Sequence, residues 1–471
     1  MPNFLACDLG AESGRVILGA LADGRISIEE LHRFQNEPVR LPTGLYWDAF
    51  RLFHEIVTGL RVAGRSRGLK VDGIGVDTWG VDFGLLGDDG ALVDNPRHYR
   101  DARTKGMMDR AFRTVSREEM FRQTGLQFME LNSLFQLYAA SQESMPALEV
   151  ARTLLFMPDL FSYWLSGRQA CELTITSTSQ FYNPREKRWA LELFEKLDMP
   201  AKMLTEIVPP GTRLGPLLPH LQDTTGLKDT DVYATASHDT ASAVAAVPAQ
   251  GTDWIYISSG TWSLMGVELE TPLINDHVLA HNFTNEIGAA GRIRFLKNIA
   301  GLWVLQECRR AWAAEGREYS YAELSEMASA APAYSGYIDP DHFIDPGHMP
   351  ERIVEYCKRG GHPVPEGHAA MARAVLESLA ERYRQVAESL ETLTGKRLNV
   401  IHIVGGGSKN RLLNQLVANR TGRKVIAGPS EATAIGNVIV QAIGAGVLKD
   451  LAQARALVAE SFGVETFEPQ E

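Results

Sequence analysis

The chain is poor in the features that mark secreted and membrane-spanning proteins. It has only four cysteines in 471 residues, and they are too scattered for a zinc site: Cys7, Cys171, Cys308 and Cys357. Scattered thiols are typical of buried, reduced cysteines, so we expect a cytoplasmic protein. The sequence contains no apolar run of bilayer-spanning length, and no basic segment followed by an apolar one at its start. We therefore expect no membrane partner.

Basic residues are also fewer than acidic ones. Lys and Arg number 47 against 58 Asp and Glu, which leaves a formal net charge of −11. Since nucleic acids bind basic surfaces, no nucleic-acid partner is expected. The content of 45% hydrophobic and 22% charged residues is that of a globular protein, and 471 residues are too many for one core. We expect two or three domains, small-molecule substrates, and a monomer or small homo-oligomer.

The two commonest nucleotide-binding signatures are missing. The sequence contains neither G-x-G-x-x-G nor G-x-x-x-x-G-K-[ST], which argues against Rossmann and P-loop folds. It does contain a glycine run, residues 405–407, between a predicted strand and a predicted helix. Bare glycines let a ligand approach the backbone near a helix N-terminus. A nucleotide turn and an ordinary tight turn both fit this run.

One short pattern occurs twice. Residues 4–19 and 254–266 each read as a strand, a polar turn with Gly and Ser, and a returning strand. Either hairpin alone would be ordinary, but one in each half of a long chain indicates two copies of one nucleotide-binding domain. The matched pairs are Gly10 with Gly260, Ser13 with Ser263, and Asp8 with Ser258.

The two turns predict a phosphate site with one metal ligand. Such a turn directs backbone N–H groups and hydroxyls into one concavity, which suits phosphate oxygens. Asp8 is a carboxylate where the second hairpin has Ser258. A single carboxylate beside bound phosphates is what one Mg²⁺ ion needs.

Strands alternate with helices in both halves, which predicts an α/β protein with largely parallel sheets and helices on both faces. We place a domain boundary after residue 247, giving domains 1–247 and 248–471. The apolar seam from Leu376 to Leu393 fits a coiled coil, but more often marks a helix packed on a core. Strand patterns cover residues 25–34, 71–83 (ending in a polar and aromatic loop), 232–236, 400–404 and 424–427, and helical patterns cover 48–65, 156–165, 241–247, 412–418 and 432–445.

A dense polar cluster, residues 237–240, follows one predicted strand. In isolation, the pattern around Asp239 fits a helix N-cap residue and a catalytic base equally well. A residue such as His238 more often forms a structural hydrogen bond than takes part in catalysis. Open parallel sheets bind ligands at the carboxyl ends of their strands, so the location favours function. Trp79 and Phe83 fit both a sugar-stacking surface and a core.

Acidic and histidine residues also gather between residues 339 and 348. They lack the helical spacing of zinc ligands, and Pro340 and Pro346 favour a rigid surface loop instead. We expect no metal there.

Taken together, these motifs resemble the FGGY family of carbohydrate kinases over nearly the whole chain. The resemblance implies two actin-like, ribonuclease-H-type domains with an interdomain cleft. Within the family it is strongest to members that phosphorylate L-rhamnulose at O1 with ATP and Mg²⁺. The segments that carry it are residues 8–15, 77–83, 99–101, 236–243, 258–266, 296–299 and 402–407.

The resemblance also implies roles for individual residues. Asp239 is expected to be the proton acceptor, and Asp8 to hold Mg²⁺ through water. The expected ATP contacts are Ala11, Glu12, Ser13, Gly14, Arg15, Thr261, Gln306 and Gly406. The expected sugar contacts are Gly80, His238, Asp239, Thr240 and Asn298.

Two other functions remain open at this point. One is an FGGY kinase for another ketose or polyol, such as L-fuculose or D-xylulose. The other is an actin-like ATPase that acts as a conformational switch. A base aimed at a sugar favours the kinase, because a nucleotide switch does not need one.

Overall fold

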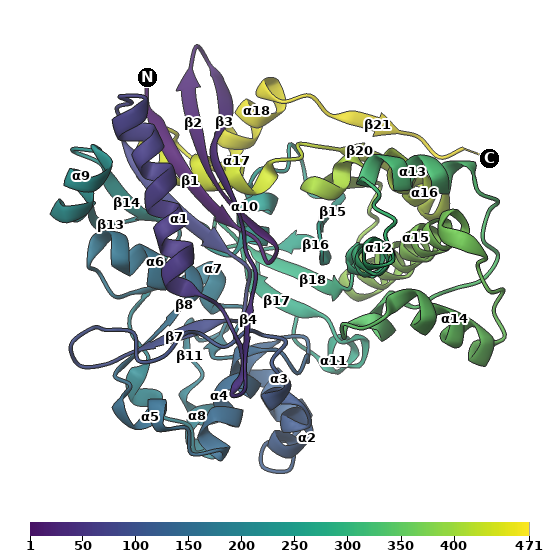
Figure 1. The fold of residues 1–471 in the computed structure, drawn as a ribbon, viewed down its shortest axis with the longest axis horizontal. Helices are drawn as coiled ribbons and strands as arrows, with labels where there is room; N and C mark the ends of the chain where they lie inside the picture. The colour runs from purple at the N-terminus through teal and green to yellow at the C-terminus, as the bar shows by residue number, and fades with distance from the viewer. Residues whose placement is uncertain (471) are drawn as a thin grey trace. The chain divides into compact units, whose positions relative to one another are not determined.

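The computed structural model describes residues 1–470, which form two compact units. The first comprises residues 1–248, 268–295 and 432–461, and the second comprises residues 249–267, 296–431 and those from 462 onward. The chain therefore passes between the units several times. The colours of Figure 1 follow the chain from its N-terminus to its C-terminus. The division into domains 1–247 and 248–471 stays a prediction.

The first unit is built on a six-stranded sheet of order β13-β14-β6-β1-β2-β3. Strands β14, β6 and β1 are parallel, and the other three pair antiparallel. The carboxyl ends of the three parallel strands therefore meet at one edge. The bounds are β1 (Asn3–Leu9), β2 (Ser13–Ala22), β3 (Arg25–Gln35), β6 (Gly73–Thr78), β13 (Thr212–Pro216) and β14 (Asp231–Ala234).

Helices cover both faces of this sheet, as predicted for an α/β fold. Helices α1 (Ala49–Arg61) and α6 (Met157–Ser166) pack against its strands, and α10 (Asp239–Ala245) packs with α17 (Ala432–Gly444). Helix α17 is tied to the sheet by side-chain amides. Gln441 donates to the Leu5 carbonyl at 3.1 Å, and Asn437 donates to the Gly75 carbonyl at 3.2 Å. Helix α18 (Leu451–Ser461) lies along β3.

The remaining elements of the first unit are short. Its further helices are α2 (Met107–Phe112), α3 (Arg117–Thr124), α4 (Ser133–Gln142), α5 (Pro146–Val150), α7 (Leu173–Thr176), α8 (Leu191–Lys196), α9 (Pro219–Thr225) and α11 (Asp276–His281). Its further strands are β4 (Val39–Leu41), β5 (Gly44–Tyr46), β7 (Phe83–Leu86), β8 (Thr153–Phe156), β9 (Cys171–Glu172), β10 (Tyr182–Asn183), β11 (Arg188–Trp189), β12 (Ile207–Val208) and β17 (Thr284–Ile287).

The second unit repeats the central motif of the first. In the first unit the β1–β2 hairpin lies beside the parallel strand β6, and here the β15–β16 hairpin lies beside the parallel strand β19. The predicted repeat is therefore confirmed. The strands are β15 (Trp254–Ser259), β16 (Ser263–Leu269), β18 (Ile293–Ile299), β19 (Val400–Val404), β20 (Lys424–Ala427) and β21 (Glu465–Phe467). Strands β16 and β18 each lie partly in the first unit, which includes residues 268–295.

The two hairpin turns differ in length, which corrects the alignment made from sequence. Leu9 pairs with Gly14, five residues on, whereas Ser259 pairs with Ser263, four residues on. Ser13 and Ser263 are therefore not structurally equivalent, because the first turn has an extra residue. The Ser263 hydroxyl instead bonds the Tyr383 hydroxyl at 2.6 Å in the core of the second unit.

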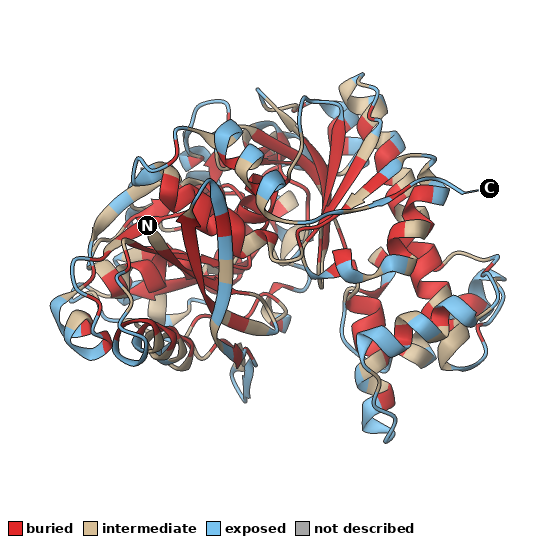
Figure 2. Ribbon diagram, turned by 90° about the horizontal axis from the view of Figure 1, so that it is seen from above, coloured by how far each residue is buried: buried red, intermediate tan, exposed pale blue. Residues whose placement is uncertain are grey.

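Helix α15 (Gly367–Thr394) is a core-facing helix and not a coiled coil. Its seam residues from Leu376 to Leu390 are buried, and it packs against α13 (Tyr321–Ala330) and α16 (Arg411–Thr421). Figure 2 shows buried strands beside helices with exposed outer faces. The other helices of this unit are α12 (Trp303–Ala314) and α14 (Met349–Gly360). In residues 1–470, none of the helices combines the length and the apolar character needed to cross a membrane.

The acidic segment from 339 to 348 packs more closely than a surface loop. Pro340 and Phe343 are buried, so the predicted surface loop is wrong for this part of the segment. Asp341 accepts a hydrogen bond from the Ala300 N–H at 3.2 Å and pairs with Arg382 at 2.7 Å. Across the described chain, no group of three or more His, Cys, Asp or Glu residues could hold a metal ion.

Candidate active site

Three chain segments of the first unit converge at the carboxyl edge of its parallel strands. The Trp79 N–H donates to the Leu9 carbonyl at 3.2 Å, and the Thr78 N–H donates to the Ser237 carbonyl at 2.9 Å. These bonds bring together the ends of β1, β6 and β14. Residues predicted from distant motifs, including Asp8, Gly80 and Asp239, thus lie at one edge of the sheet.

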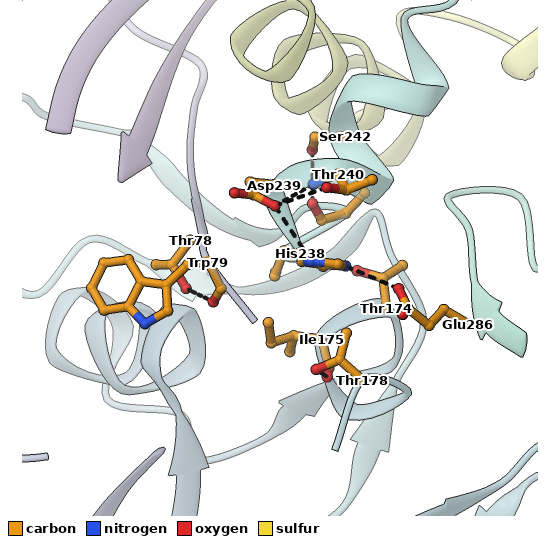
Figure 3. Close-up of polar contacts among 12 residues, drawn as sticks. Thr78, Trp79, Thr174, Ile175, Thr178, His238, Asp239, Thr240, Ser242 and Glu286 are labelled. Atoms are coloured by element: carbon orange, nitrogen blue, oxygen red, sulfur yellow. Dashed lines mark hydrogen bonds and ion pairs between the residues drawn. The ribbon is translucent and has the colours of Figure 1, made fainter. Parts of the chain in front are cut away.

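Asp239 is the first residue of α10, and its side chain is 31% exposed. The N-cap position belongs to His238, so the N-cap alternative for Asp239 is wrong. The Oδ1 atom of Asp239 accepts from the Thr240 N–H at 2.5 Å and from the Thr240 hydroxyl at 3.2 Å. Figure 3 shows these bonds at the start of the helix. Its carboxylate is thereby oriented but still reachable.

Burial, and then the negative charge of Asp8, raise the pKa of Asp239 to about 7. A general base works best when its pKa lies near the operating pH. The environment therefore suits Asp239 to accept a proton from a substrate hydroxyl.

This raised pKa predicts the pH dependence of turnover. A carboxylate can act as a base only when it is deprotonated, so kcat/KM should rise with pH and level off above a midpoint near 7. The measurement is kcat/KM from pH 5 to 9 at fixed ionic strength. A plateau that extends unchanged down to pH 5 would show that no group with this pKa limits the reaction.

His238 lies beside Asp239 and is almost completely buried. Its Nε2 is 3.3 Å from Asp239 Oδ1. A Cβ atom at Gly80 would lie only 3.4 Å from the same nitrogen, so Gly80 leaves room next to the ring. The structure therefore brings together the predicted sugar contacts Gly80, His238, Asp239 and Thr240.

The aromatic residues next to this site are chiefly core residues. The indoles of Trp47 and Trp79 both donate to Asp82 Oδ2, at 2.6 and 2.9 Å, and their ring centroids are 4.1 Å apart. Trp79 is only 5% exposed, and Phe83 is buried in β7. The buried Asp82 thus fixes Trp79, a role that its sequence neighbours did not reveal.

The β1–β2 hairpin places an ion pair at the strand ends. Asp8 and Arg15 are directly opposite in the ladder, and Arg15 Nη2 is 2.5 Å from Asp8 Oδ2. The predicted phosphate contacts Ala11 to Gly14 form the turn and the first residues of β2. The turn, Asp8 and Arg15 therefore form one local group.

The same edge has the donor set that Mg²⁺ prefers. Asp77 lies opposite Asp8 in the parallel β1–β6 pair, and both carboxylates are buried. Asp77 Oδ2 accepts from Asn437 at 2.6 Å, while its Oδ1 has no hydrogen-bond partner in the described structure. Burial and the charge of Asp8 raise the pKa of Asp77. Because Mg²⁺ usually binds one or two carboxylates plus waters and phosphates, these residues fit it.

The second unit groups the other predicted nucleotide contacts. The backbone N–H groups of Leu302 and Trp303 donate to the carbonyls of Gly260 and Thr261, at 3.2 and 3.0 Å. This docks the start of α12 on the hairpin turn. Gln306 lies in the first part of α12, and its Oε1 is buried without a hydrogen-bond partner in residues 1–470. Asn298 lies near the end of β18, five residues before the first residue of α12.

The glycine run lies against the end of β15. A Cβ atom added at Gly407 would lie 2.0 Å from the Ser259 hydroxyl and 3.0 Å from its carbonyl oxygen, so no side chain fits there. A Cβ atom at Gly406 would meet nothing within 4 Å. The run thus packs through Gly407 and leaves Gly406 open, which suits a ligand contact at Gly406.

This difference predicts opposite effects for neighbouring substitutions. Gly407→Ala should destabilise the protein by about 1–3 kcal/mol, because the methyl group overpacks the turn. Gly406→Ala is the matched control and should leave the thermal midpoint nearly unchanged. Thermal melts of both variants check this, and equal destabilisation would contradict the packing described.

The predicted residues thus form a group in each unit. The first unit holds Asp8, the turn from Ala11 to Arg15, Gly80, His238, Asp239 and Thr240, and the second holds Thr261, Asn298, Gln306 and Gly406. Sequence reasoning missed two buried charged residues beside His238, Glu286 and Arg294. The one sequence signal for Arg294 is a charge within the otherwise apolar start of β18.

Two family models match nearly the whole chain. The N-terminal domain of the FGGY family of carbohydrate kinases matches residues 3–246, and the C-terminal domain of that family matches residues 255–445.

Two rhamnulokinases match over nearly their full length. A rhamnulokinase of Bacteroides thetaiotaomicron is 45% identical over 471 residues, which cover 100% of this chain and 96% of that relative. A rhamnulokinase of Bacillus subtilis is 37% identical, covering 99% of this chain and 96% of that relative.

Solved structures match the fold at low identity. A xylulose kinase from Lactobacillus acidophilus superposes with a TM-score of 0.80 at 16% identity, covering 100% of this chain and 94% of that one. Plasmodium falciparum glycerol kinase with ADP superposes with a TM-score of 0.79 at 15% identity, with the same coverage. The predicted two-domain, actin-like α/β fold is confirmed.

Proposed function

Because the chain belongs to the FGGY family of carbohydrate kinases, we propose that it transfers the γ-phosphoryl group of ATP to O1 of L-rhamnulose. The product is L-rhamnulose 1-phosphate, an intermediate of L-rhamnose use. The observation that carries the choice of sugar is the identity of 37–45% to rhamnulokinases over nearly the full chain. The oriented carboxylate of Asp239 supports the kinase chemistry.

Asp239 acts as the base in this proposal. Its carboxylate accepts the proton of the O1 hydroxyl as that oxygen attacks the γ-phosphorus, and ADP leaves with the bridging oxygen. His238, Thr240 and Gly80 orient the sugar, and Asn298 is a further sugar contact in this proposal. Phosphoryl transfer needs alignment and charge stabilisation more than covalent chemistry, so positioned polar groups suffice.

The proposed nucleotide contacts come from both halves of the chain. The first hairpin offers backbone N–H groups from Ala11 to Gly14 together with the Arg15 guanidinium. The other proposed contacts are Thr261, Gln306 and Gly406. Asp8, with Asp77 beside it, would hold Mg²⁺; when bound, this ion would supply positive charge that neutralises the triphosphate.

The cysteine content supports the cellular location that we propose for this activity. The cysteines Cys7, Cys171, Cys308 and Cys357 are all free and buried, which suits a reducing cytoplasm. We propose a cytoplasmic enzyme that works on ATP and a free ketose, as a monomer or small homo-oligomer.

A panel of sugars tests the substrate. L-Rhamnulose should give the highest kcat/KM in a coupled ADP assay, ahead of L-fuculose and D-xylulose. A higher value for either competitor would keep the kinase but overturn the choice of sugar, because a small change in a sugar pocket can reverse specificity.

A further inference from the structure

A buried ion pair lies on the side of His238 that faces away from Asp239. Arg294 of β18 is 0% exposed and Glu286 of β17 is 6% exposed, and Arg294 Nη2 is 3.1 Å from Glu286 Oε2. Arg294 Nε also donates to the Ile287 carbonyl at 3.1 Å. The guanidinium is thus held rigidly and cannot reach solvent.

This guanidinium contacts the imidazole directly. Arg294 Nη2 is 3.0 Å from His238 Nδ1. A guanidinium only donates, so Nδ1 must be the accepting, unprotonated nitrogen. In a neutral imidazole the proton then resides on Nε2, which faces Asp239 Oδ1 at 3.3 Å. Figure 3 shows Asp239 and Glu286 on opposite sides of the ring.

Without Arg294 the opposite proton arrangement would be favoured. Glu286 Oε2 lies 3.5 Å from Nδ1 and would attract a proton to that nitrogen. Arg294 neutralises Glu286 and occupies the Nδ1 lone pair at the same time. Burial, and then the charge of Arg294, also hold the pKa of His238 well below its usual range, so the ring stays neutral.

We propose that Arg294 is a positioning residue that holds His238 as the neutral Nε2–H tautomer. The imidazole then presents a donor toward Asp239 and the space beside Gly80, and it cannot itself take the proton of a substrate hydroxyl. The role of base is left to Asp239. This consequence for catalysis rests on the proposed function, whereas the tautomer does not.

Other charges near the ring do not replace this contact. Asp239 faces Nε2 and Glu286 faces Nδ1, as described above. Glu172, at the N-terminal end of α7, accepts from the backbone N–H of Ser237 at 3.1 Å. The charge of Asp8 raises the pKa of Asp239, and the charges of Asp8 and Asp239 raise the pKa of Asp77, whereas the charge that shifts the pKa of His238 is that of Arg294. Arg294 is thus the cation that faces the imidazole within the described chain.

The tautomer can be measured without sugar or nucleotide. The test is ¹⁵N NMR of the full protein with labelled histidine, with the His238 signals assigned by their loss in His238→Gln. In the wild type, Nε2 should carry the proton and Nδ1 should not, unchanged from pH 5.5 to 8. A protonated Nδ1, or an imidazolium within this range, would overturn the proposal.

Three variants separate positioning from a structural role. Arg294→Met removes the donor, so Nδ1 should become protonated toward Glu286, and kcat should fall by up to about 100-fold through misorientation. Arg294→Lys keeps a donor and should preserve the Nε2–H signal. Arg292→Met is the matched control, since Arg292 is partly exposed and pairs with the exposed Glu270.

The outcomes are distinct. An unchanged Nε2–H tautomer in folded Arg294→Met would overturn the proposal. If that variant does not fold, the test is the wild-type spectrum, in which a protonated Nδ1 would overturn the proposal. Normal tautomers in a protein that phosphorylates no sugar would instead contradict the proposed function alone.

Discussion

Replacement of Asp239 by Asn is expected to lower kcat by roughly 10²–10⁴-fold, the usual contribution of a general base. Asn keeps the shape of the side chain and its acceptor for the Thr240 N–H, but an amide does not take up the proton of an attacking hydroxyl. The variant should fold and bind ATP and the ketose with nearly normal affinity. A coupled kinase assay, a thermal melt and a nucleotide titration on one preparation check this.

A matched control is available at another helix start. Asp276 is the exposed first residue of α11, so Asp276→Asn makes the same change at the same helix position. It should leave kcat unchanged. If Asp239→Asn retained more than a few per cent of wild-type kcat, the reaction would need another base.

Asp8→Asn is expected to lower kcat by roughly 100-fold at limiting Mg²⁺, because loss of a metal-positioning charge removes several kcal/mol of transition-state stabilisation. Asn still accepts from Arg15, so the hairpin should persist. The charge of Asp8 also raises the pKa of Asp239. Removing it should therefore move the acid limb of the pH profile to lower pH.

Titration of activity with Mg²⁺ measures this effect. Glu29→Gln serves as the control, because Glu29 is a strand carboxylate paired with Arg67 on the exposed side of the first unit. A Mg²⁺ dependence in Asp8→Asn equal to that of the wild type would refute a role of Asp8 toward the metal.

Patterns local to the chain were enough to predict most of the fold. Alternating and helical periodicity predicted the β1–β2 hairpin, the strand β19 and the helix α15, because each depends on neighbouring residues. The length of the turn at Gly10 was missed, since one extra residue in a polar turn leaves no trace in hydrophobic pattern. The return of α17 to the first unit was also missed, because it depends on contacts with β1 and β6.

In the candidate site, too, the sequence identifies residues that are neighbours in the chain and misses those that only the fold brings together. Asp239 and His238 stand together in one polar run, so the sequence identifies them. Glu286 and Arg294 reach His238 only through the fold, because they lie 48 and 56 residues further along the chain. Trp79 was ambiguous for a related reason: its burial depends on Trp47 and Asp82, which a motif cannot place.

Quantitative ³¹P NMR of a reaction of the wild-type protein with ATP, Mg²⁺ and L-rhamnulose tests the central claim most directly. The account predicts one equivalent of a sugar 1-phosphate for each ADP formed, and almost no ADP when the sugar is left out. ADP and inorganic phosphate released at the same rate with or without the ketose would contradict it, and would identify an ATPase switch instead.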